Sequence, residues 1–174
     1  MPNKERVAIV TGASRGIGRA TAIRLASDFS AVVLVARDAV ALASAADAVK
    51  AAGATSLTLS RDLRVADAAR EAIETTRDRF GRIDALVNIA GAVPQTDLFA
   101  MSEEEWTDGL SLKFHAARRL TLAAWETLAR SSGSVAFMSG TSALTPKASL
   151  AAVGTINAAI SALAKAFAER GVER

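Results

Sequence analysis

The residues best placed to do chemistry lie near the N-terminus, where three glycines follow a short apolar run. Residues 7–10 are of strand length, Gly12, Gly16 and Gly18 come next, and a helical pattern follows. A strand, a glycine-rich turn and a helix N-terminus in this order form an anion site, because free backbone N–H groups and the helix dipole point at one spot. Gly12 permits a tight turn, Gly16 a close approach of the ligand, and Gly18 close packing of helix on strand. We expect a phosphate group to bind here.

The motif Thr-Gly-Ala-Ser-Arg-Gly-Ile-Gly at residues 11–18 closely resembles the cofactor motif of the short-chain dehydrogenase/reductase family. Its spacing is T-G-x-x-x-G-x-G rather than G-x-G-x-x-G. The resemblance implies that the turn binds the diphosphate of a nicotinamide dinucleotide, whereas a tight turn without a ligand is the alternative for an isolated motif. The cofactor-binding residues expected in this turn are Gly12, Ser14, Arg15, Gly16, Ile17 and Gly18.

The end of the second apolar run, residues 31–36, indicates which cofactor is preferred. In dinucleotide folds a carboxylate near this point binds the adenosine ribose, whereas an arginine accommodates a 2′-phosphate. Ala36 leaves the acidic position empty, and Arg37 follows it. Arg15 and Arg37 can together bind the extra phosphate, because a guanidinium group matches phosphate geometry. We expect NADP(H), with NAD(H) possible; the alternative is that both are ordinary surface arginines.

The third apolar run, residues 55–60, ends at a second match to the family. In the family an Asp at this point hydrogen-bonds the adenine amino group, and the next residue lines the pocket of the ring. The resemblance assigns these roles to Asp62 and Leu63. Alternatively, Asp62 caps the helix that begins a few residues later.

The fourth apolar run leads into Asn88-Ile89-Ala90-Gly91, which resembles the family's Asn-Asn-Ala-Gly motif. Ile89 replaces the second Asn. The resemblance implies that Asn88 ties the sheet together through side-chain bonds to backbone. It also implies that Ala90 and Gly91 let the cofactor's ribose pass close to the chain.

The catalytic residues of the family are largely missing. Its proton relay uses a Tyr-x-x-x-Lys pair, a Ser after the fifth strand and an Asn in a preceding helix. This chain contains no tyrosine. Val153 stands at the tyrosine position and Asn157 at the lysine position. Asn157 can hydrogen-bond a ribose hydroxyl, but it cannot shift a neighbour's pKa by charge.

Residues at two other positions can replace the missing catalytic groups. Gly140 stands at the serine position, and the adjacent Ser139 or Thr141 either supplies a catalytic hydroxyl or bonds its own turn. Lys113 stands at the Asn position, in a segment expected to be buried near the nicotinamide, where a lysine must find a partner or lower its pKa. A partly neutral Lys113 can act as an acid/base. The alternative is that its ammonium group reaches solvent or the cofactor phosphate.

Apolar runs that alternate with helical segments position these residues and predict an α/β fold. We expect a doubly wound, Rossmann-type parallel sheet with helices on both faces, truncated after its sixth helix, in a single domain over 1–174. The region carrying the family's substrate loops is expected to be absent, either because the chain is part of a longer polypeptide or because it is short. Strands are expected near 6–11, 31–36, 55–60, 84–89 and 134–139, and helices near 16–28, 39–52, 66–79, 102–130 and 148–170.

Composition excludes several other classes of function. The net charge is +3 with no basic stripe, so we expect no nucleic-acid partner. The chain has no cysteine and a single histidine, His115, so we expect neither a disulfide framework nor a metal site. We also expect no membrane-spanning run, no signal segment and a cytoplasmic location. By resemblance, the helices at 102–130 and 148–170 lie on one face and build a homodimer or homotetramer.

Two functions follow from these observations. The leading one is an NADP-preferring oxidoreductase that transfers hydride between the nicotinamide and a small carbonyl or alcohol substrate, with Lys113 and either Ser139 or Thr141 as atypical catalytic residues. The other is a catalytically inactive relative that binds NADP(H) as a sensor or scaffold. The absent Tyr, Lys and Ser motivate this alternative.

Overall fold

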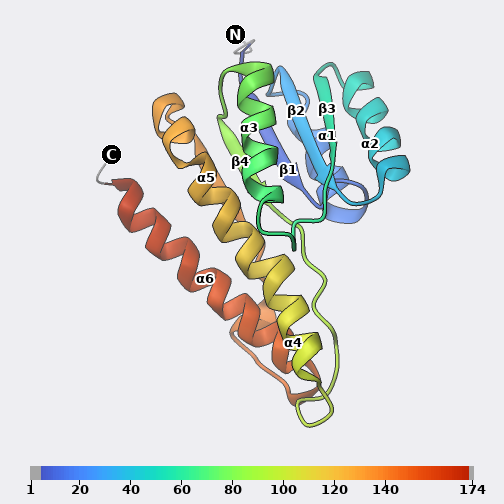
Figure 1. Ribbon diagram of the computed structural model, residues 1–174, viewed down its shortest axis with the longest axis vertical. Helices are drawn as coiled ribbons and strands as arrows, with labels where there is room; N and C mark the ends of the chain where they lie inside the picture. Colours follow the sequence, from blue (N-terminus) through green and yellow to red (C-terminus); the bar gives the residue numbers. More distant parts are fainter. Residues whose placement is uncertain (1–4, 173–174) are drawn as a thin grey trace.

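Five parallel strands form the centre of the computed structural model, which describes residues 5–172 (Figure 1). Their order across the sheet is β3-β2-β1-β4-β5. Residues 1–4 and 173–174, the ends of the expected domain, lie outside the described residues. The strands are β1 (Val7–Thr11), β2 (Ala31–Ala36), β3 (Thr55–Ser60), β4 (Ala85–Asn88) and β5 (Ser134–Phe137).

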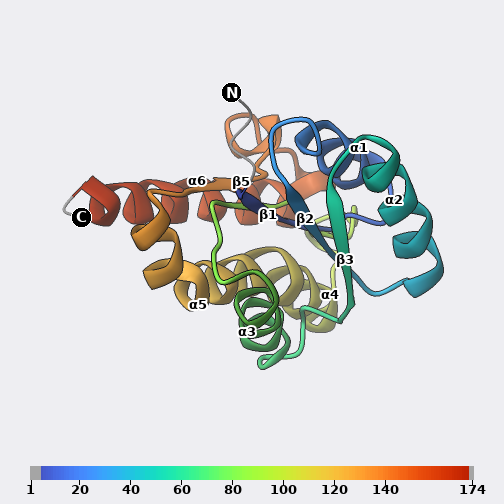
Figure 2. The same cartoon turned by 90° about the horizontal axis from the view of Figure 1, so that it is seen from above.

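Helices cover both faces of the sheet (Figure 2), which confirms the doubly wound, Rossmann-type fold. In β1 and β2 every residue except Ala36 is buried, since each strand packs on helices above and below. Ala8, Val10, Val32 and Leu34 face α1 and α2, whereas alternate residues of the same strands face α3 and α5. The helices are α1 (Gly16–Leu25), α2 (Ala39–Ala51), α3 (Ala68–Phe80), α4 (Glu103–Gly109), α5 (Ala116–Ser131) and α6 (Ala151–Val172).

The helix expected over 102–130 is not a uniform α-helix. A π-helical segment, η1 (Leu110–His115), lies between α4 and α5. A π turn inserts an extra residue into the helical repeat and is frequent at functional sites. It changes the direction in which the following side chains point. Lys113 lies in this segment.

The expectation that the chain contains no run of membrane-spanning length is wrong. The helix Ala148–Val172 spans 25 residues and is long and apolar enough to cross a membrane by length and composition. It begins with the 3-10 turn η3 (Ala148–Leu150) and continues as α6. Only 28% of its most apolar stretch is buried within the described part of the chain. In Figure 1, α6 lies beside α5, and the two are joined by the Trp125 and Phe167 rings, whose centroids are 5.4 Å apart.

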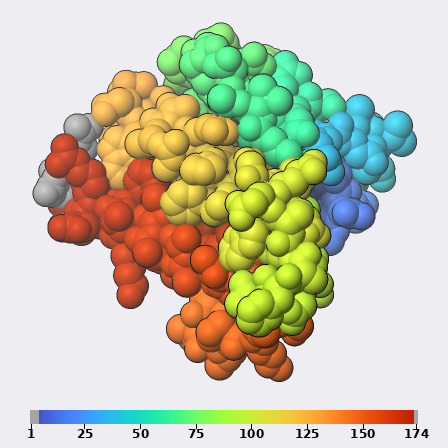
Figure 3. All heavy atoms as spheres, turned by 60° about the horizontal axis from the view of Figure 1, so that its bottom comes forward, coloured from blue at the N-terminus to red at the C-terminus, as the bar shows by residue number. Residues whose placement is uncertain are grey.

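Two loops gather at the end of the molecule that carries the N-termini of α4 and α6. The Leu98 amide donates to the Ala148 carbonyl at 3.0 Å, which ties the loop before α4 to the loop before α6. Figure 3 shows this contact region as yellow-green and orange atoms lying against each other. The second loop includes a 3-10 turn, η2 (Thr141–Ala143), close to α6.

Candidate cofactor and catalytic site

A cavity of about 820 Å³ opens at the carboxyl ends of β1, β2 and β4. The strand order reverses between β1 and β4, which is the place where open α/β sheets bind their ligands. The cavity brings together most of the residues expected to hold the cofactor. It is lined by Gly12, Ser14, Arg15, Gly16, Ile17, Gly18, Arg37, Leu63, Ala90 and Gly91, and also by Lys113.

The glycine turn has the backbone that the sequence pattern requires. Gly12 and Gly16 have φ values of +67° and +55°, a region that side chains rarely permit. A Cβ atom on Gly18 would lie 2.2 Å from the Gly12 carbonyl oxygen, so only glycine lets α1 start this close to β1. The first turn of α1 carries no acidic residue. Its free N–H groups and positive dipole end therefore fit a diphosphate.

Basic side chains lie at the part of the cavity next to the end of β2. Arg15 and Arg37 are exposed, and both line the cavity. Asp38 does not counter them at close range, because its carboxylate caps α2 by accepting from the Ala41 amide at 2.9 Å. The closest carboxylate recorded for Arg37 is that of Asp62, at 3.9 Å. This ion pair is long and exposed, so it leaves the Arg37 guanidinium group accessible to an anion in the cavity.

Asp62 does not cap the following helix. Its carboxylate accepts from the Arg64 amide at 3.0 Å, whereas α3 begins at Ala68 with Asp67 as its N-cap residue. The alternative role considered for Asp62 is therefore wrong. Its side chain is 37% exposed and does not line the cavity, although Leu63 beside it does.

Asn88 differs from the expectation that it bonds backbone groups. Its amide nitrogen donates to the Thr121 hydroxyl at 3.4 Å, and its buried amide oxygen has no hydrogen-bond partner among residues 5–172. The backbone carbonyl of Asn88, by contrast, accepts from the Met138 amide at 2.9 Å. The tie between β4 and the chain beyond β5 is thus made by main-chain atoms.

Thr11 makes the side-chain link to this part of the backbone that was expected of Asn88. Its hydroxyl oxygen accepts from the amides of Ile89 and Ala90 at 2.9 and 3.0 Å, and the residue is 1% exposed. The bond holds the segment after β4 against the glycine turn. The motif contained Thr11, but only the spatial pairing of β1 with β4 reveals this role.

Replacing Thr11 by valine is expected to lower the free energy of unfolding by about 2 kcal/mol, because the two partly buried amides of Ile89 and Ala90 lose their acceptor. Valine has nearly the same shape, so the loss reports the hydrogen bonds rather than a cavity. Urea unfolding followed by circular dichroism measures it. Thr107→Val, at an exposed position of α4, is the matched control. Equal stabilities of the two variants would contradict the assignment.

Lys113 and Asn157 lie in contact, although they are far apart in the sequence. The Lys113 ammonium group donates to the Asn157 amide oxygen at 2.5 Å, and the Asn157 amide nitrogen donates to the Ser142 hydroxyl at 2.8 Å. Burial lowers the pKa of Lys113. Sequence reasoning considered Ser139 and Thr141 but missed Ser142. The amide of Asn157, expected to meet a ribose hydroxyl, has both ends occupied.

The two hydroxyls expected in the catalytic site are placed differently. The Ser139 hydroxyl lies 2.9 Å from both the Asn157 carbonyl and the Ser161 hydroxyl, so it faces α6. Thr141 is exposed at the start of η2. A Cβ atom on Gly140 would lie 2.8 Å from the Asn157 amide nitrogen, so a serine at this position would require the Asn157 side chain to shift.

An ion pair ties α4, the helix that precedes the segment carrying Lys113, to the turn after β3. Arg64 donates two hydrogen bonds to Asp108, the last acidic residue of α4. This contact lowers the pKa of Asp108, mainly through the hydrogen bonds from Arg64. The pair holds α4 against the turn after β3. Within residues 5–172 no group of three or more His, Asp or Glu side chains is arranged to hold a metal ion.

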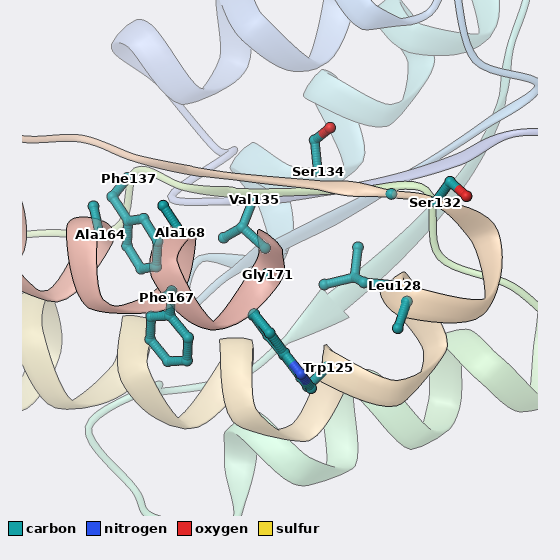
Figure 4. Close-up of a pocket in the computed structure, with 12 residues that line it drawn as sticks. Trp125, Leu128, Ser132, Ser134, Val135, Phe137, Ala164, Phe167, Ala168 and Gly171 are labelled. Atoms are coloured by element: carbon teal, nitrogen blue, oxygen red, sulfur yellow. The ribbon is translucent and has the colours of Figure 1, made fainter. Parts of the chain in front are cut away.

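A second cavity, of about 560 Å³, lies at the open edge of β5 (Figure 4). Its lining is mostly apolar and comes from three elements. Val135 and Phe137 project from β5, Trp125 from α5 and Phe167 from α6. The Phe137 and Phe167 rings stack with centroids 5.9 Å apart. None of the expected site residues lines this groove.

Comparison with protein families gives one match over nearly the whole chain. The model of the family described as short chain dehydrogenase matches residues 6–173. A short-chain reductase protein of Streptomyces niveus, NovJ, is 39% identical over 121 residues, which cover 70% of this chain and 46% of NovJ. A 3-oxoacyl-[acyl-carrier-protein] reductase of Synechocystis is 41% identical over 102 residues, 58% of this chain and 41% of that protein. The chain thus matches less than half the length of either relative.

Solved structures agree with this match. A metagenomic short-chain oxidoreductase in complex with NADP is 31% identical and superimposes with a TM-score of 0.92, over 98% of this chain and 78% of that one. An alcohol dehydrogenase from Thermococcus sibiricus, complexed with 5-hydroxy-NADP, is 27% identical with a TM-score of 0.91, over 95% and 71% of the two chains.

Proposed function

This chain belongs to the short-chain dehydrogenase family, and from that membership we propose that it is an oxidoreductase that binds NADP(H) and acts on a carbonyl or alcohol substrate. The observation that carries the proposal is the glycine turn with two arginines beside it. The turn can present the free amides of α1 to a diphosphate. Arg15 and Arg37 line the same cavity as Ala36, which stands where a carboxylate would select NAD.

The proposed chemistry divides between the cofactor and the protein. The nicotinamide, when bound, supplies or accepts the hydride. Lys113 holds the proton: its ammonium group donates to the substrate oxygen during reduction, and the neutral amine accepts that proton during oxidation. Lys113 is suited to both directions because it lines the cofactor cavity and burial lowers its pKa.

Two specific observations favour a second function. No tyrosine is present, and the Ser139 hydroxyl is turned toward α6. An inactive protein that binds NADP(H) as a sensor or scaffold is consistent with these features. The two proposals share cofactor binding and differ in turnover.

The test separates binding from turnover. We expect NADPH fluorescence to change on titration with the protein, and we expect turnover when ketones and alcohols are screened with the bound cofactor. Binding without turnover of any compound would support the sensor or scaffold. A calorimetric titration with neither NADPH nor NADH giving heat would remove both proposals.

Arg37→Asp is expected to weaken NADPH binding by about tenfold, because a hydrogen bond to a charged group contributes about 1.5–3 kcal/mol and this one is exposed. The new carboxylate repels the 2′-phosphate and can accept from ribose hydroxyls, so NADH binding should not weaken. Calorimetry with both cofactors measures the ratio of the NADPH and NADH dissociation constants. Arg24→Asp, on the exposed end of α1 and outside the cavity, is the control. An unchanged ratio for Arg37→Asp would refute NADP preference through this residue.

A further inference from the structure

The Lys113 ammonium group has a single hydrogen-bond partner within residues 5–172, and that partner is on another helix. Lys113 lies on η1 and is half-buried, whereas Asn157 lies on α6 and is 3% exposed. No carboxylate forms an ion pair with Lys113 in this part of the chain. A half-buried cation with one neutral acceptor depends on that acceptor for its position.

The orientation of the Asn157 amide is fixed from the other side. Its nitrogen donates to the Ser142 hydroxyl, so its oxygen is directed to Lys113. The backbone carbonyl of Asn157 accepts from the Ser139 hydroxyl at 2.9 Å. Gly140 leaves room for the amide, since a Cβ atom there would lie 2.8 Å from its nitrogen. The loop 139–142 thus surrounds Asn157.

The position in which Asn157 holds Lys113 is at the wall of the cofactor cavity. The Lys113 stem lies against Gly91, where an added Cβ atom would be 3.1 Å from the lysine Cδ. Gly91 and Lys113 both line the cavity. Lys113 therefore contacts Asn157 from the wall of the cavity, although Asn157 itself does not line it.

Charged groups around Lys113 do not account for its lowered pKa. On α4, Asp108 is paired with Arg64, and α6 presents the uncharged Asn157. The cause of the lowered pKa of Lys113 is burial, with no contribution from a charged neighbour. The other charged or titratable residues near it are His115 on the same helical segment and, along the cavity, Arg15, Arg37, Asp38 and Arg61.

We propose that Asn157, oriented by Ser142, is the positioning residue of Lys113 and holds its ammonium group at the cavity wall for proton transfer. The role of Lys113 in proton transfer rests on the proposed function. The positioning itself does not, because it can be measured without a substrate. The two positions are those at which the family resemblance places an Asn and a Lys, so the ammonium group now comes from η1 and its acceptor from α6.

The experiment measures how Lys113 reacts with an amine-acylating reagent, acetic anhydride, as a function of pH in the folded protein. Only the neutral amine reacts, so the midpoint of labelling, read by peptide mass spectrometry, reports the pKa. We expect Asn157→Asp to raise the midpoint by about one pH unit or more, since an adjacent carboxylate favours the ammonium form. Asn157→Leu should lower the midpoint, and Ser142→Ala should shift it in the same direction by less.

Two controls accompany the variants. Ser161→Ala removes a hydroxyl that contacts the Asn157 backbone but not its amide side chain, and should leave the midpoint unchanged. Lys165, exposed on α6, serves as an internal reference in every sample. If Asn157→Leu fails to fold by circular dichroism, Ser142→Ala and Asn157→Asp decide the question.

The outcomes separate this proposal from the proposed function. Midpoints that shift as described while no variant and no wild-type sample turns over substrate support positioning and contradict the oxidoreductase. Midpoints that stay at the wild-type value in folded Asn157→Asp and Ser142→Ala overturn positioning, whether or not the protein is active. In an active protein, the pH limb of kcat should move with the labelling midpoint, whereas KM for NADPH should hardly change.

Discussion

Replacing Lys113 by methionine is expected to lower kcat for carbonyl reduction by about 10²–10⁴-fold, the contribution that a positioned acid/base usually makes. Methionine keeps an unbranched stem against Gly91 but has no proton to give. NADPH affinity should fall far less, because the diphosphate and the 2′-phosphate are expected to meet the glycine turn and the two arginines. Steady-state kinetics with a screened substrate, together with NADPH titration, measure the two effects separately.

The lowered pKa of Lys113 predicts how the reaction rate and the stability change with pH. Burial lowers the pKa of Lys113 below its ordinary value of 10.5. Reduction needs the ammonium form, so its rate should fall as the pH rises through the lowered pKa, and oxidation should show the opposite trend. Stability should also change, because the unfolded chain binds a proton at pH values where the folded chain does not. Wild-type stability should therefore rise with pH up to the unfolded pKa of Lys113, and Lys113→Met should lose this rise.

Lys147→Met is the matched control, since Lys147 is exposed in the loop before α6. It should keep both the rate and the pH profile of the wild type. A Lys113→Met variant that reduces the substrate at the wild-type rate would show that the proton comes from elsewhere.

Gly18→Ala is expected to weaken NADPH binding by about 100-fold, because overpacking costs about 1–3 kcal/mol and the obstructing atom here is rigid backbone. The new Cβ atom would lie 2.2 Å from the Gly12 carbonyl oxygen and 2.7 Å from its carbon. The strain is relieved only if α1 moves away from β1, which displaces the amides that face the cavity. Calorimetric titration with NADPH measures the loss, and thermal unfolding measures the accompanying drop in stability.

Gly53→Ala provides the comparison. Gly53 has a φ of +102° in the turn before β3, with no atom within 4 Å of an added Cβ, and it does not line the cavity. The substitution should lower stability through backbone strain while leaving NADPH affinity unchanged. If Gly18→Ala bound NADPH as tightly as Gly53→Ala, the glycine turn could not be the diphosphate site.

The glycine turn and the sheet could be predicted because their determinants are local. A run such as residues 31–36 is apolar at every position, which indicates a strand buried on both faces, and the glycines occupy fixed offsets from β1. Boundaries were predicted less well. The strand expected over 134–139 ends at Phe137, so Ser139 lies beyond it and turns toward α6.

The contacts around the candidate catalytic residues could not be predicted from the sequence, because they join segments that are far apart along the chain. Asp62 is a local example. Its sequence context allows it either to cap a helix or to accept a hydrogen bond within the turn after β3, and in the folded chain it accepts from the Arg64 amide. The π-helical segment that carries Lys113 is another example, because its sequence does not distinguish it from the α-helix expected over 102–130.

The alternation of strands and helices along the chain, the glycine-rich turn of residues 12–18 and the absence of a tyrosine can all be identified before the chain is folded, because each depends on neighbouring residues. The hydrogen-bonded chain of Lys113, Asn157 and Ser142 becomes visible only in the folded protein. The physical reason is that Lys113 and Asn157 are 44 positions apart and meet only after α6 packs on η1. No local propensity or spacing encodes such a contact.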